Sequence, residues 1–507
     1  MPAQSQTRSH SHGLGSSATP LGATYVSVSW NWIRSATGYR IQVAGHRNFS
    51  DKIVTRKTRS AAKRPAGGRQ ATVVGHLKDA HYYWVRVRRV SGSHKSHWSA
   101  PDRVATKAKW PDPITGVSDV AGPGPGETTI HWTSGGSYTD FFRIKTGLTP
   151  FGSAKTPARG RHAHTFRVPG NKRSFTMTAA QSRAAGARLG SGHHLFFRII
   201  AVRQGRADTQ ARPYGHLQHA TIAGHSPETN GASLRVASYN VHVEAKDVPG
   251  HPWSTRTPLV AQNLARQNPA IVGFQELVPA MWDGREGGIG LQAALKRVGM
   301  GNYNLTRTTA YASGAPGDVR ILYDPSRVKM VSNCSPNKIS CAIRLPDPGP
   351  LHVAAYAKFR DVASGQEFWF VTAHLNHGNN ASTDKLRGRQ AQAIVKKMNK
   401  INGQHLPVIV SGDFNSSQTS AGHDAPHQTL LHAGYYDTTA AATQVNLQYN
   451  SVNDYAADEK PSNYGFGSMI DSIMTLHMPG ASRFEEVLTG NPYPSDHNLI
   501  YADVRLP

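Results

Sequence analysis

The pattern of apolar and polar positions divides the chain near residue 233. In residues 21–108, the runs TYVSVSWNW, GYRIQVA and YYWVRVRRV alternate apolar and polar side chains between basic loops. In residues 113–225, TIHW, DFFRIKTG and HHLFFRIIAV follow in the same order. A period of two predicts half-buried β-strands, so we expect two consecutive all-β sandwiches. Residues 1–20 offer almost nothing to bury and are expected to be disordered.

Residues 233–507 have a different pattern, in which apolar strands alternate with amphipathic helices. The segments LRVASYNV, AIVGFQEL, EFWFVTAHL, PVIVSGDFN, SMIDSIMTL and LIYADVRL are predicted strands. The segments TPLVAQNLARQ and DKLRGRQAQAIVKKMNKI carry apolar residues at helical spacing. This alternation predicts a layered α/β domain.

Charge is distributed unevenly along the 507 residues, whose net charge is +26. Residues 1–230 contain 33 lysines and arginines against 9 acidic residues, whereas residues 231–507 contain 24 against 22. Such asymmetry favours a front half that meets a polyanion. Nucleic acid, an anionic wall polymer and anionic lipid all fit. A generally basic background or a solubility device is the alternative.

Three further features bear on the compartment. No stretch reaches the roughly 18 apolar residues of a membrane helix, which excludes an integral helical membrane protein. The start, MPAQSQTRSHSHGLGSS, has no apolar segment typical of a signal peptide. Cys334 and Cys341 are compatible with a small disulfide loop and equally with two free thiols, and without a CxxC pair they do not predict a zinc site.

Polar side chains follow the predicted strands of the back half. They are carboxylates, amides and imidazoles: Asn240, Glu276, His374, Asp413, Asn415, Asp471, Asp496 and His497. Buried strands that end in such groups point them into one cleft. Carboxylate oxygens suit Mg²⁺, Mn²⁺ or Ca²⁺, and imidazoles stabilise charge on a phosphoryl group, so the set predicts metal-assisted hydrolysis at phosphorus.

Local spacing adds two expectations about side-chain direction. If the strand continues through GDFN, Asp413 and Asn415 share one face and Phe414 points into the core. Asp496 and His497 are adjacent and would face opposite ways in a strand. We therefore expect them in a loop, after a turn at Pro494.

The two front units resemble fibronectin type III modules. The first has a core tryptophan at Trp30, a tyrosine in the next strand at Tyr39, and Leu77 followed six residues later by Tyr83. The second is degenerate, because a leucine, Leu195, stands where the corner tyrosine is expected. The resemblance implies spacer or adhesion modules, which in bacteria are typically extracellular.

The motifs SYNV, GFQEL, TAHL, GDFN, ID and SDH, in that order, resemble the endonuclease/exonuclease/phosphatase superfamily. The resemblance covers about residues 233–507. It implies a four-layer α-β-β-α sandwich and a metal-dependent phosphoesterase. It implies that Glu276 binds the cation, that Asn240 positions metal or phosphate, and that Asp496 is a metal-side or structural aspartate. Mg²⁺ is the expected ion, with Mn²⁺ or Ca²⁺ as alternatives.

The same resemblance implies roles for the catalytic residues. Asp413 orients or deprotonates the attacking water, and the amide of Asn415 binds phosphate. His497 contacts a phosphate oxygen or acts as general acid or base, and Asp471 pairs with it. His374 is the second histidine of the site. Its partner stays unassigned, since the segment GDVRILYD offers Asp318 and Arg320 instead of the family's glutamate.

Three functions remain open at this point. The first is a secreted nuclease that acts on DNA, with the basic front half holding the polyanion. The second is an inositol-phosphate phosphatase or a sphingomyelinase-type diesterase. The polar loop NHGNNASTD shows no membrane wedge, and Trp282 is weak support for a lipid. The third is a non-catalytic adhesion protein, which the intact polar set argues against.

Overall fold

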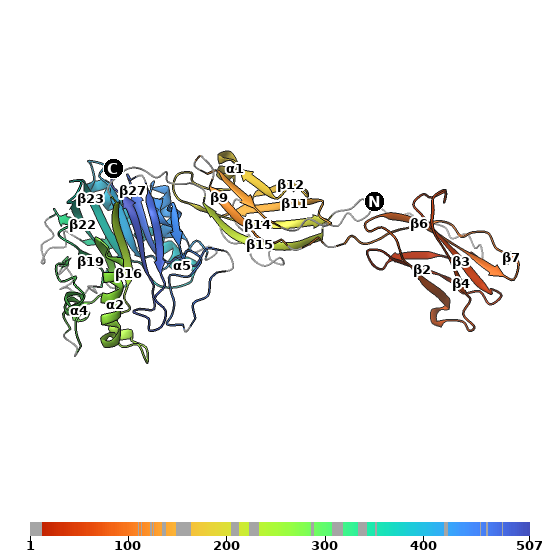
Figure 1. The fold of residues 1–507 in the computed structure, drawn as a ribbon, viewed down its shortest axis with the longest axis horizontal. Helices are drawn as coiled ribbons and strands as arrows, with labels where there is room; N and C mark the ends of the chain where they lie inside the picture. Colours follow the sequence, from red (N-terminus) through yellow and green to blue (C-terminus); the bar gives the residue numbers. More distant parts are fainter. Residues whose placement is uncertain are drawn as a thin grey trace.

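The computed structural model describes residues 13–109, 111–112, 114–121, 124, 126–133, 138–148, 164–203, 233–284, 288–306, 318–332, 342–349, 352–419, 424–456, 458–462, 465–478 and 480–507, with the backbone of 212–222. Three units follow one another along the longest axis, with the C-terminal unit at one end (Figure 1). In these residues no helix has the length and apolarity needed to cross a membrane. Cys334 and Cys341 lie outside the described residues.

The first unit is a sandwich of two antiparallel sheets. One contains β1 (Ser17–Pro20), β2 (Val26–Asn31) and β5 (Arg69–Val74). The other contains β4 (Lys52–Arg59), β3 (Gly38–Ala44), β6 (Tyr82–Ser91) and β7 (His94–Lys95), and β8 (Asp102–Ala105) also pairs with β6. Trp30 and Tyr39 meet in the core with ring centroids 5.1 Å apart.

The expectation of disorder over residues 1–20 is wrong for its last part. Residues 17–20 form β1, which pairs with β2. Leu14 is buried in the core of the unit, and Asp102 accepts the backbone N–H of Ala18 at 2.7 Å. A single apolar side chain and a row of backbone hydrogen bonds therefore order a segment that its composition predicts to be free. Residues 1–12 lie outside the described residues.

The second unit is also a two-sheet sandwich. Its three-stranded sheet contains β9 (Ser118–Ala121), β10 (Thr128–His131) and β13 (Ser174–Met177). Its four-stranded sheet contains β12 (His164–Pro169), β11 (Phe141–Gly147), β14 (His194–Arg203) and β15 (Arg212–Ile222). A short helix, α1 (Ala179–Ala184), precedes β14. Arg203 at the end of β14 forms ion pairs with Asp79 of the first unit and Asp140 of the second.

The third unit places two sheets face to face. The first sheet has the order β18 (Asn304–Leu305), β19 (Arg320–Tyr323), β17 (Ile271–Gln275), β16 (Ser233–Asn240), β29 (Leu499–Arg505), β28 (Ala481–Val487) and β26 (Thr443–Val445). The second has the order β20 (Val328–Met330), β22 (His352–Asp361), β23 (Glu367–His374), β24 (Val408–Asp413), β27 (Asp471–Leu476) and β25 (Tyr436–Asp437), with β21 (Ala342–Leu345) paired to β22.

Helices cover the outer faces of both sheets. A core that includes Val236 and Phe370 fills the space between the sheets. Helices α2 (Trp253–Gln267), α3 (Pro279–Asp283) and α4 (Leu291–Arg297) pack outside the first sheet, and α5 (Ala381–Ile401) and α6 (Ala425–His432) outside the second. The predicted four-layer α-β-β-α sandwich is confirmed for this unit.

The second unit packs directly against the third. Phe196 of β14 is fully buried in the central core of the third unit, 5.9 Å from the ring of Phe466. Ser191 accepts the N–H of Asp437 at 2.8 Å. Gln418 donates to the carbonyl of His194 at 2.7 Å. These contacts make the second sandwich part of one folded body with the C-terminal unit.

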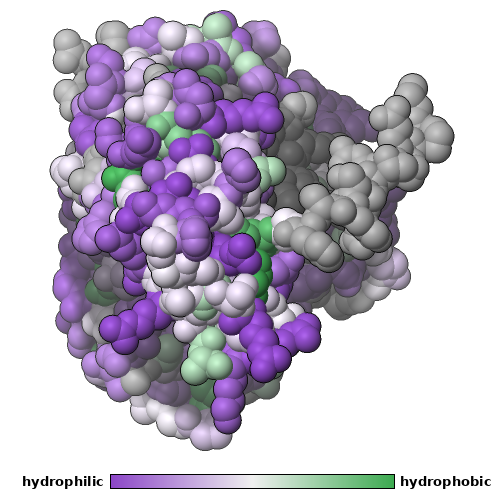
Figure 2. Space-filling view, turned by 90° about the vertical axis from the view of Figure 1, so that its right-hand side faces the viewer, coloured by the Kyte–Doolittle hydropathy of each residue, from purple (hydrophilic) through white to green (hydrophobic). Residues whose placement is uncertain are grey.

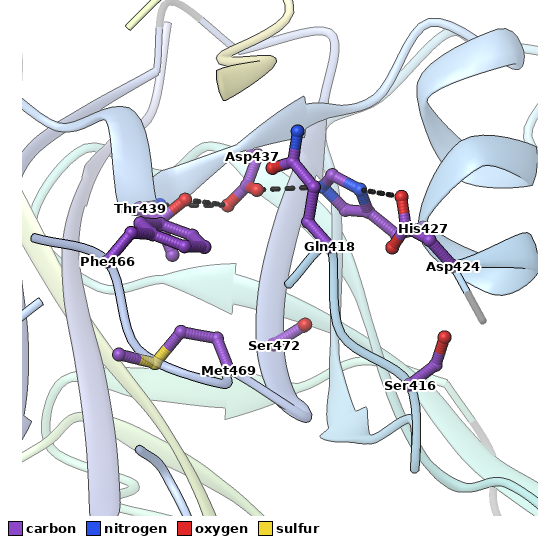
Figure 3. Close-up of a pocket in the computed structure, with 9 residues that line it drawn as sticks. All are labelled: Ser416, Gln418, Asp424, His427, Asp437, Thr439, Phe466, Met469 and Ser472. Atoms are coloured by element: carbon purple, nitrogen blue, oxygen red, sulfur yellow. Dashed lines mark hydrogen bonds and ion pairs between the residues drawn. The ribbon is translucent and has the colours of Figure 1, made fainter. Parts of the chain in front are cut away.

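A buried ion-pair cluster lies in this interface around a cavity of about 10 Å³ (Figure 3). His427 Nε2 is 2.7 Å from Asp437 and its Nδ1 is 3.3 Å from Asp424. Burial opposes the charged form of His427, but the two flanking carboxylates raise its pKa to about 10. Thr439 donates to Asp437 at 2.6 Å, so the cluster is tied to the loop that contacts the second unit.

We predict that Phe196→Ala lowers the free energy of unfolding by about 3–5 kcal/mol, because it leaves a cavity in a core built by two units. Chemical denaturation followed by tryptophan fluorescence measures this. The matched control is Phe175→Ala, which removes a half-buried ring inside the second unit alone and should cost less. Equal losses for the two variants would contradict the shared core.

Candidate active site

The strand register brings the predicted residues to one edge of the two sheets. Asn240 ends β16 opposite Gln275 of the parallel strand β17, and Glu276 follows directly. On the other sheet, Asp413 at the end of β24 lies between His374 at the end of β23 and Asp471 at the start of β27. Parallel neighbouring strands end at the same edge of a sheet, and an antiparallel neighbour begins there. The side chains of five residues therefore meet at this edge: Asn240, Glu276, His374, Asp413 and Asp471.

Asp413 occupies the centre of this site and is 1% exposed. Its Oδ2 accepts the amide of Asn240 at 3.1 Å and lies 3.6 Å from His374 Nε2 and 3.7 Å from His497 Nε2. Its Oδ1 accepts the N–H of Asn415 at 2.8 Å. A carboxylate buried this deeply needs such partners, because an unpaired charge in the interior is strongly unfavourable.

Asn240 joins the two carboxylates of the site. The same amide nitrogen donates to Glu276 Oε1 at 3.1 Å, and its oxygen accepts the N–H of His242 at 3.0 Å. Glu276 Oε2 accepts the N–H of Val243 at 2.8 Å. Although burial opposes ionisation, the charge of His374 and these two hydrogen bonds lower the pKa of Glu276. Glu276 is therefore an anion at neutral pH.

The backbone of Glu276 is itself unusual. Its φ is +62°, in the left-handed region that few residues other than glycine adopt. This turn directs the carboxylate back toward Asn240 instead of along the strand. Below it, Gly273 allows the two sheets to approach closely, since a Cβ there would lie 2.3 Å from Ser411 Oγ. The close approach brings Asn240 of one sheet within reach of Asp413 of the other.

His497 and Asp471 form a buried pair. His497 Nδ1 lies 2.9 Å from Asp471 Oδ2, and both side chains are less than one-tenth exposed. Burial opposes the charge on His497, but Asp471 and Asp413 raise its pKa well above the usual value. Because Asp471 fixes the proton on Nδ1, the other nitrogen, Nε2, is directed to Asp413 and Asn240.

His374 is held between two carboxylates. Its Nδ1 is 3.6 Å from Asp318 Oδ2, and its Nε2 faces Asp413. Burial opposes protonation, but Asp318, Asp413 and Glu276 together raise the pKa of His374 to about 9. Asp318 is therefore the partner that the sequence left unassigned. The side chains of His374 and Asp318 are 17% and 24% exposed, so they border the opening of the site.

Two geometric expectations have different outcomes. Asn415 does not continue the strand, because β24 ends at Asp413 and Asn415 has a φ of +49°. Its amide donates to the carbonyl of Leu375 at 2.9 Å, while Phe414 is buried as expected. The expectation of a loop for Asp496 and His497 is confirmed, since β29 begins only at Leu499.

Asp496 lies at the rim and contacts residues that sequence reasoning missed. Its Oδ2 is 3.7 Å from His242 Nδ1, and that nitrogen is 2.7 Å from the hydroxyl of Tyr455. Ser495, next to Asp496, donates to the carbonyl of Asn240 at 2.8 Å. His242 follows the end of β16 and has a φ of +55°, so strand periodicity gives no signal for it.

Arg256 of α2 was also missed. It is 1% exposed and donates to the carbonyls of Val241 and Pro494 at 2.6 and 3.3 Å and to Asp247 at 2.5 Å. One guanidinium thus fixes the loops that follow Asn240 and precede Asp496. A lone arginine within an amphipathic helix gives no sequence signal for this role.

The donor set fits a hard divalent cation on the Glu276 side of the site. The carboxylates of Glu276 and Asp413 are linked by the neutral amide of Asn240. Glu276 accepts two hydrogen bonds, from Asn240 and Val243, and its remaining lone pairs can bind a cation. One atom each of Asp413, Asp471 and His497 also lie within 4.8 Å of one another. Within that trio, Asp471 is already paired with His497 at 2.9 Å.

Comparison with known proteins gives matches at the level of structure alone. No protein-family model and no curated protein matches the chain. Similar solved structures include an endonuclease/exonuclease/phosphatase family protein from Bacteroides thetaiotaomicron, with 20% identity over 55% of this chain and 100% of that chain and a TM-score of 0.42. A second, from Bacteroides vulgatus, has 22% identity over 54% and 100%, with a TM-score of 0.42. A mannosyl-6-phosphatase from Bacteroides thetaiotaomicron has 21% identity over 54% and 99%, with a TM-score of 0.39.

We predict that His374 in the metal-free protein titrates near pH 9 and that Asp318→Asn lowers this midpoint by at least about one pH unit. Because the pKa is raised on folding, the ion pairs contribute stability that is complete below about pH 6.5 and is lost as the pH rises through about 9. Histidine NMR and thermal unfolding across this range measure both effects. An unshifted midpoint in the variant would exclude Asp318 as the partner.

Proposed function

We propose that the C-terminal unit is a divalent-metal-dependent phosphoesterase that cleaves phosphodiester bonds of nucleic acid. The observation that carries the proposal is the convergence on Asp413 of Asn240, His374 and His497, with Glu276 beside them and Asp471 behind His497. The buried carboxylate of Asp413 provides a base, and the neighbouring His374 and His497, whose pKa values are raised, provide positive charge in the same site.

In this proposal, Asp413 orients the attacking water and accepts its proton. His497 and His374, both protonated at neutral pH, stabilise the extra charge on the phosphoryl oxygens in the transition state, and one of them donates a proton to the leaving oxygen. Asp471 accepts the Nδ1–H of His497 and fixes the orientation of its ring. The second amide hydrogen of Asn415 remains available to a phosphate oxygen, since the group has two donors. Mg²⁺ held by Glu276 would neutralise phosphate charge, with Asn240 and Asp496 beside it.

The choice of nucleic acid rests on charge. The 33 basic residues against 9 acidic ones in residues 1–230 favour a long polyanion over a small phosphate ester. The loop before α5 is polar and offers no apolar surface to a lipid, so nothing in it favours the sphingomyelinase alternative. We further propose that the two sandwiches, at 21–108 and 113–225, are fibronectin type III-like modules and that the protein acts outside the cell.

We predict that the protein nicks supercoiled plasmid in Mg²⁺ and that EDTA abolishes the activity. His497→Ala and Asp413→Ala should each lower the rate by about 10²–10⁴-fold, as expected for loss of a general acid or base. Sphingomyelin and inositol polyphosphates serve as parallel substrates. Phosphate or phosphocholine release without nicking would refute the nuclease and favour the alternative phosphoesterases, and inactivity on all three would favour the non-catalytic adhesion protein.

We predict that removal of residues 1–109 lowers affinity for long DNA but leaves hydrolysis of a small diester unchanged. The cut leaves the second unit in place, because its Phe196 is required by the core of the third. Filter binding and a chromogenic diester assay separate the two effects. Equal affinity of both chains for long DNA would show that the first unit does not hold the substrate.

A further inference from the structure

The first unit presents one sheet face that carries only positive charge. The face consists of side chains that alternate with the buried residues of β3, β6 and β8, of the β4 residue opposite Arg40, and of one loop residue: Arg40, Arg47, Lys57, Arg86, Arg88 and Arg103. We call it the cationic face. Figure 2 looks onto the end of the molecule formed by the first unit, and hydrophilic residues dominate the surface there.

No carboxylate of residues 21–108 forms an ion pair with a side chain of the cationic face. Residues 21–108, all described, contain three acidic residues, and each has partners elsewhere. Asp51 accepts the N–H groups of Gly45 and His46, and Asp102 accepts that of Ala18. Asp79 pairs with Arg203 of the second unit. The positive charge on this face is therefore available to a ligand.

Three of the cations stand directly opposite one another. Arg40 of β3 pairs in register with Lys57 of β4 on one side and with Arg88 of β6 on the other. Adjacent strands are only about 4.8 Å apart, and like charges in directly opposite positions destabilise a sheet. A row of three such residues weakens the isolated sandwich, but the same row attracts an extended polyanion.

Aromatic rings hold the guanidinium groups on this face. Arg86 and Arg88 lie 4.6 and 4.4 Å from the ring centroid of Trp98, and Arg86 is 4.0 Å from that of Phe49. Arg103 lies 4.8 Å from the centroid of Tyr82. Cation–π contact fixes these long side chains, so less rotamer entropy is lost when a ligand binds. The Nε of Arg88 is buried without a hydrogen-bond partner among the described residues.

We propose that the cationic face is a docking surface for double-stranded DNA, bound through its phosphate backbone. The inference rests on the proposed function, because it assigns the first unit the substrate of the C-terminal site. Two N–H groups of one guanidinium can donate to two oxygens of the same phosphate, and we take this as favouring a phosphodiester over a carboxylate polymer. The half-buried ring of Trp98 already contacts the guanidinium groups of Arg86 and Arg88, so it offers little stacking surface to unpaired bases, which favours a duplex over a single strand.

The test measures the salt dependence of DNA binding by the full chain. EDTA is present throughout, so that cleavage does not interfere. Anisotropy of a labelled duplex of about 30 base pairs is followed between about 50 and 300 mM salt. The variant Arg40→Gln/Arg88→Gln removes two cations of the face. The matched control, Arg34→Gln/Lys78→Gln, removes two exposed cations from loops of the same unit.

We expect the face variant to reduce the slope of log affinity against log salt by about 2 and to weaken binding at least about tenfold near 100 mM salt. The control should keep the wild-type slope. The face variant should unfold at the same temperature as the wild type or higher, because its like-charge row is relieved. The unfolding temperature therefore distinguishes a loss of DNA contacts from a damaged fold.

Two results would overturn the proposal: a face variant with the wild-type slope, or a wild-type chain that binds a glycerol-phosphate wall polymer but not the duplex. Plasmid nicking distinguishes this inference from the proposed function. If nicking is absent while the slopes differ as expected, the nuclease assignment fails and the docking surface stands.

Discussion

The buried carboxylate of Asp413 is the constraint around which the C-terminal unit is organised. At 1% exposure, it requires compensation by donors from both sheets. Asn240 comes from the first sheet, His374 from the second, and His497 from the loop before the last strand. Since each of these partners has its own partner in Glu276, Asp318 and Asp471, respectively, satisfying one buried charge positions the whole set.

This arrangement explains why the two sheets must meet as closely as they do. A polar layer lies directly beneath the site, where Gln275 donates to Thr372 of the other sheet at 2.8 Å. Gly273 makes room for that layer. Farther from the site, a large cluster of apolar side chains packs between the sheets, among them Phe370 and Ile409. Apolar packing holds the two sheets together, and the candidate active site lies at the polar end of the space between them.

Much of this organisation was predictable from sequence because strand ends are local features. The alternation of apolar and polar residues predicted the strands, and the residue after each strand predicted the contents of the site. The errors have a different physical origin. Asn415 leaves the strand in a left-handed turn, and residues 17–20 are ordered by hydrogen bonds to β2. Asp318 reaches His374 across 56 residues of sequence, and no local pattern encodes such a contact.

The relation between the units could not be predicted from sequence either. An apolar residue in a predicted β-strand is expected to pack in the core of its own sandwich. Phe196 instead packs in the core of the third unit. The second unit is thereby a fixed part of the C-terminal body, whereas Arg203 links it to the first unit through an ion pair with Asp79. A basic first unit joined to a rigid body that carries the site suits a long, charged substrate.

The central claim is that the Asp413 site directs water to phosphorus with the help of a divalent cation. Hydrolysis of bis(4-nitrophenyl) phosphate in ¹⁸O-labelled water tests it most directly. The account predicts turnover that depends on Mg²⁺ or Mn²⁺ and one ¹⁸O in the 4-nitrophenyl phosphate product. Label in the nitrophenol, or no turnover with Mg²⁺, Mn²⁺ or Ca²⁺, would contradict it.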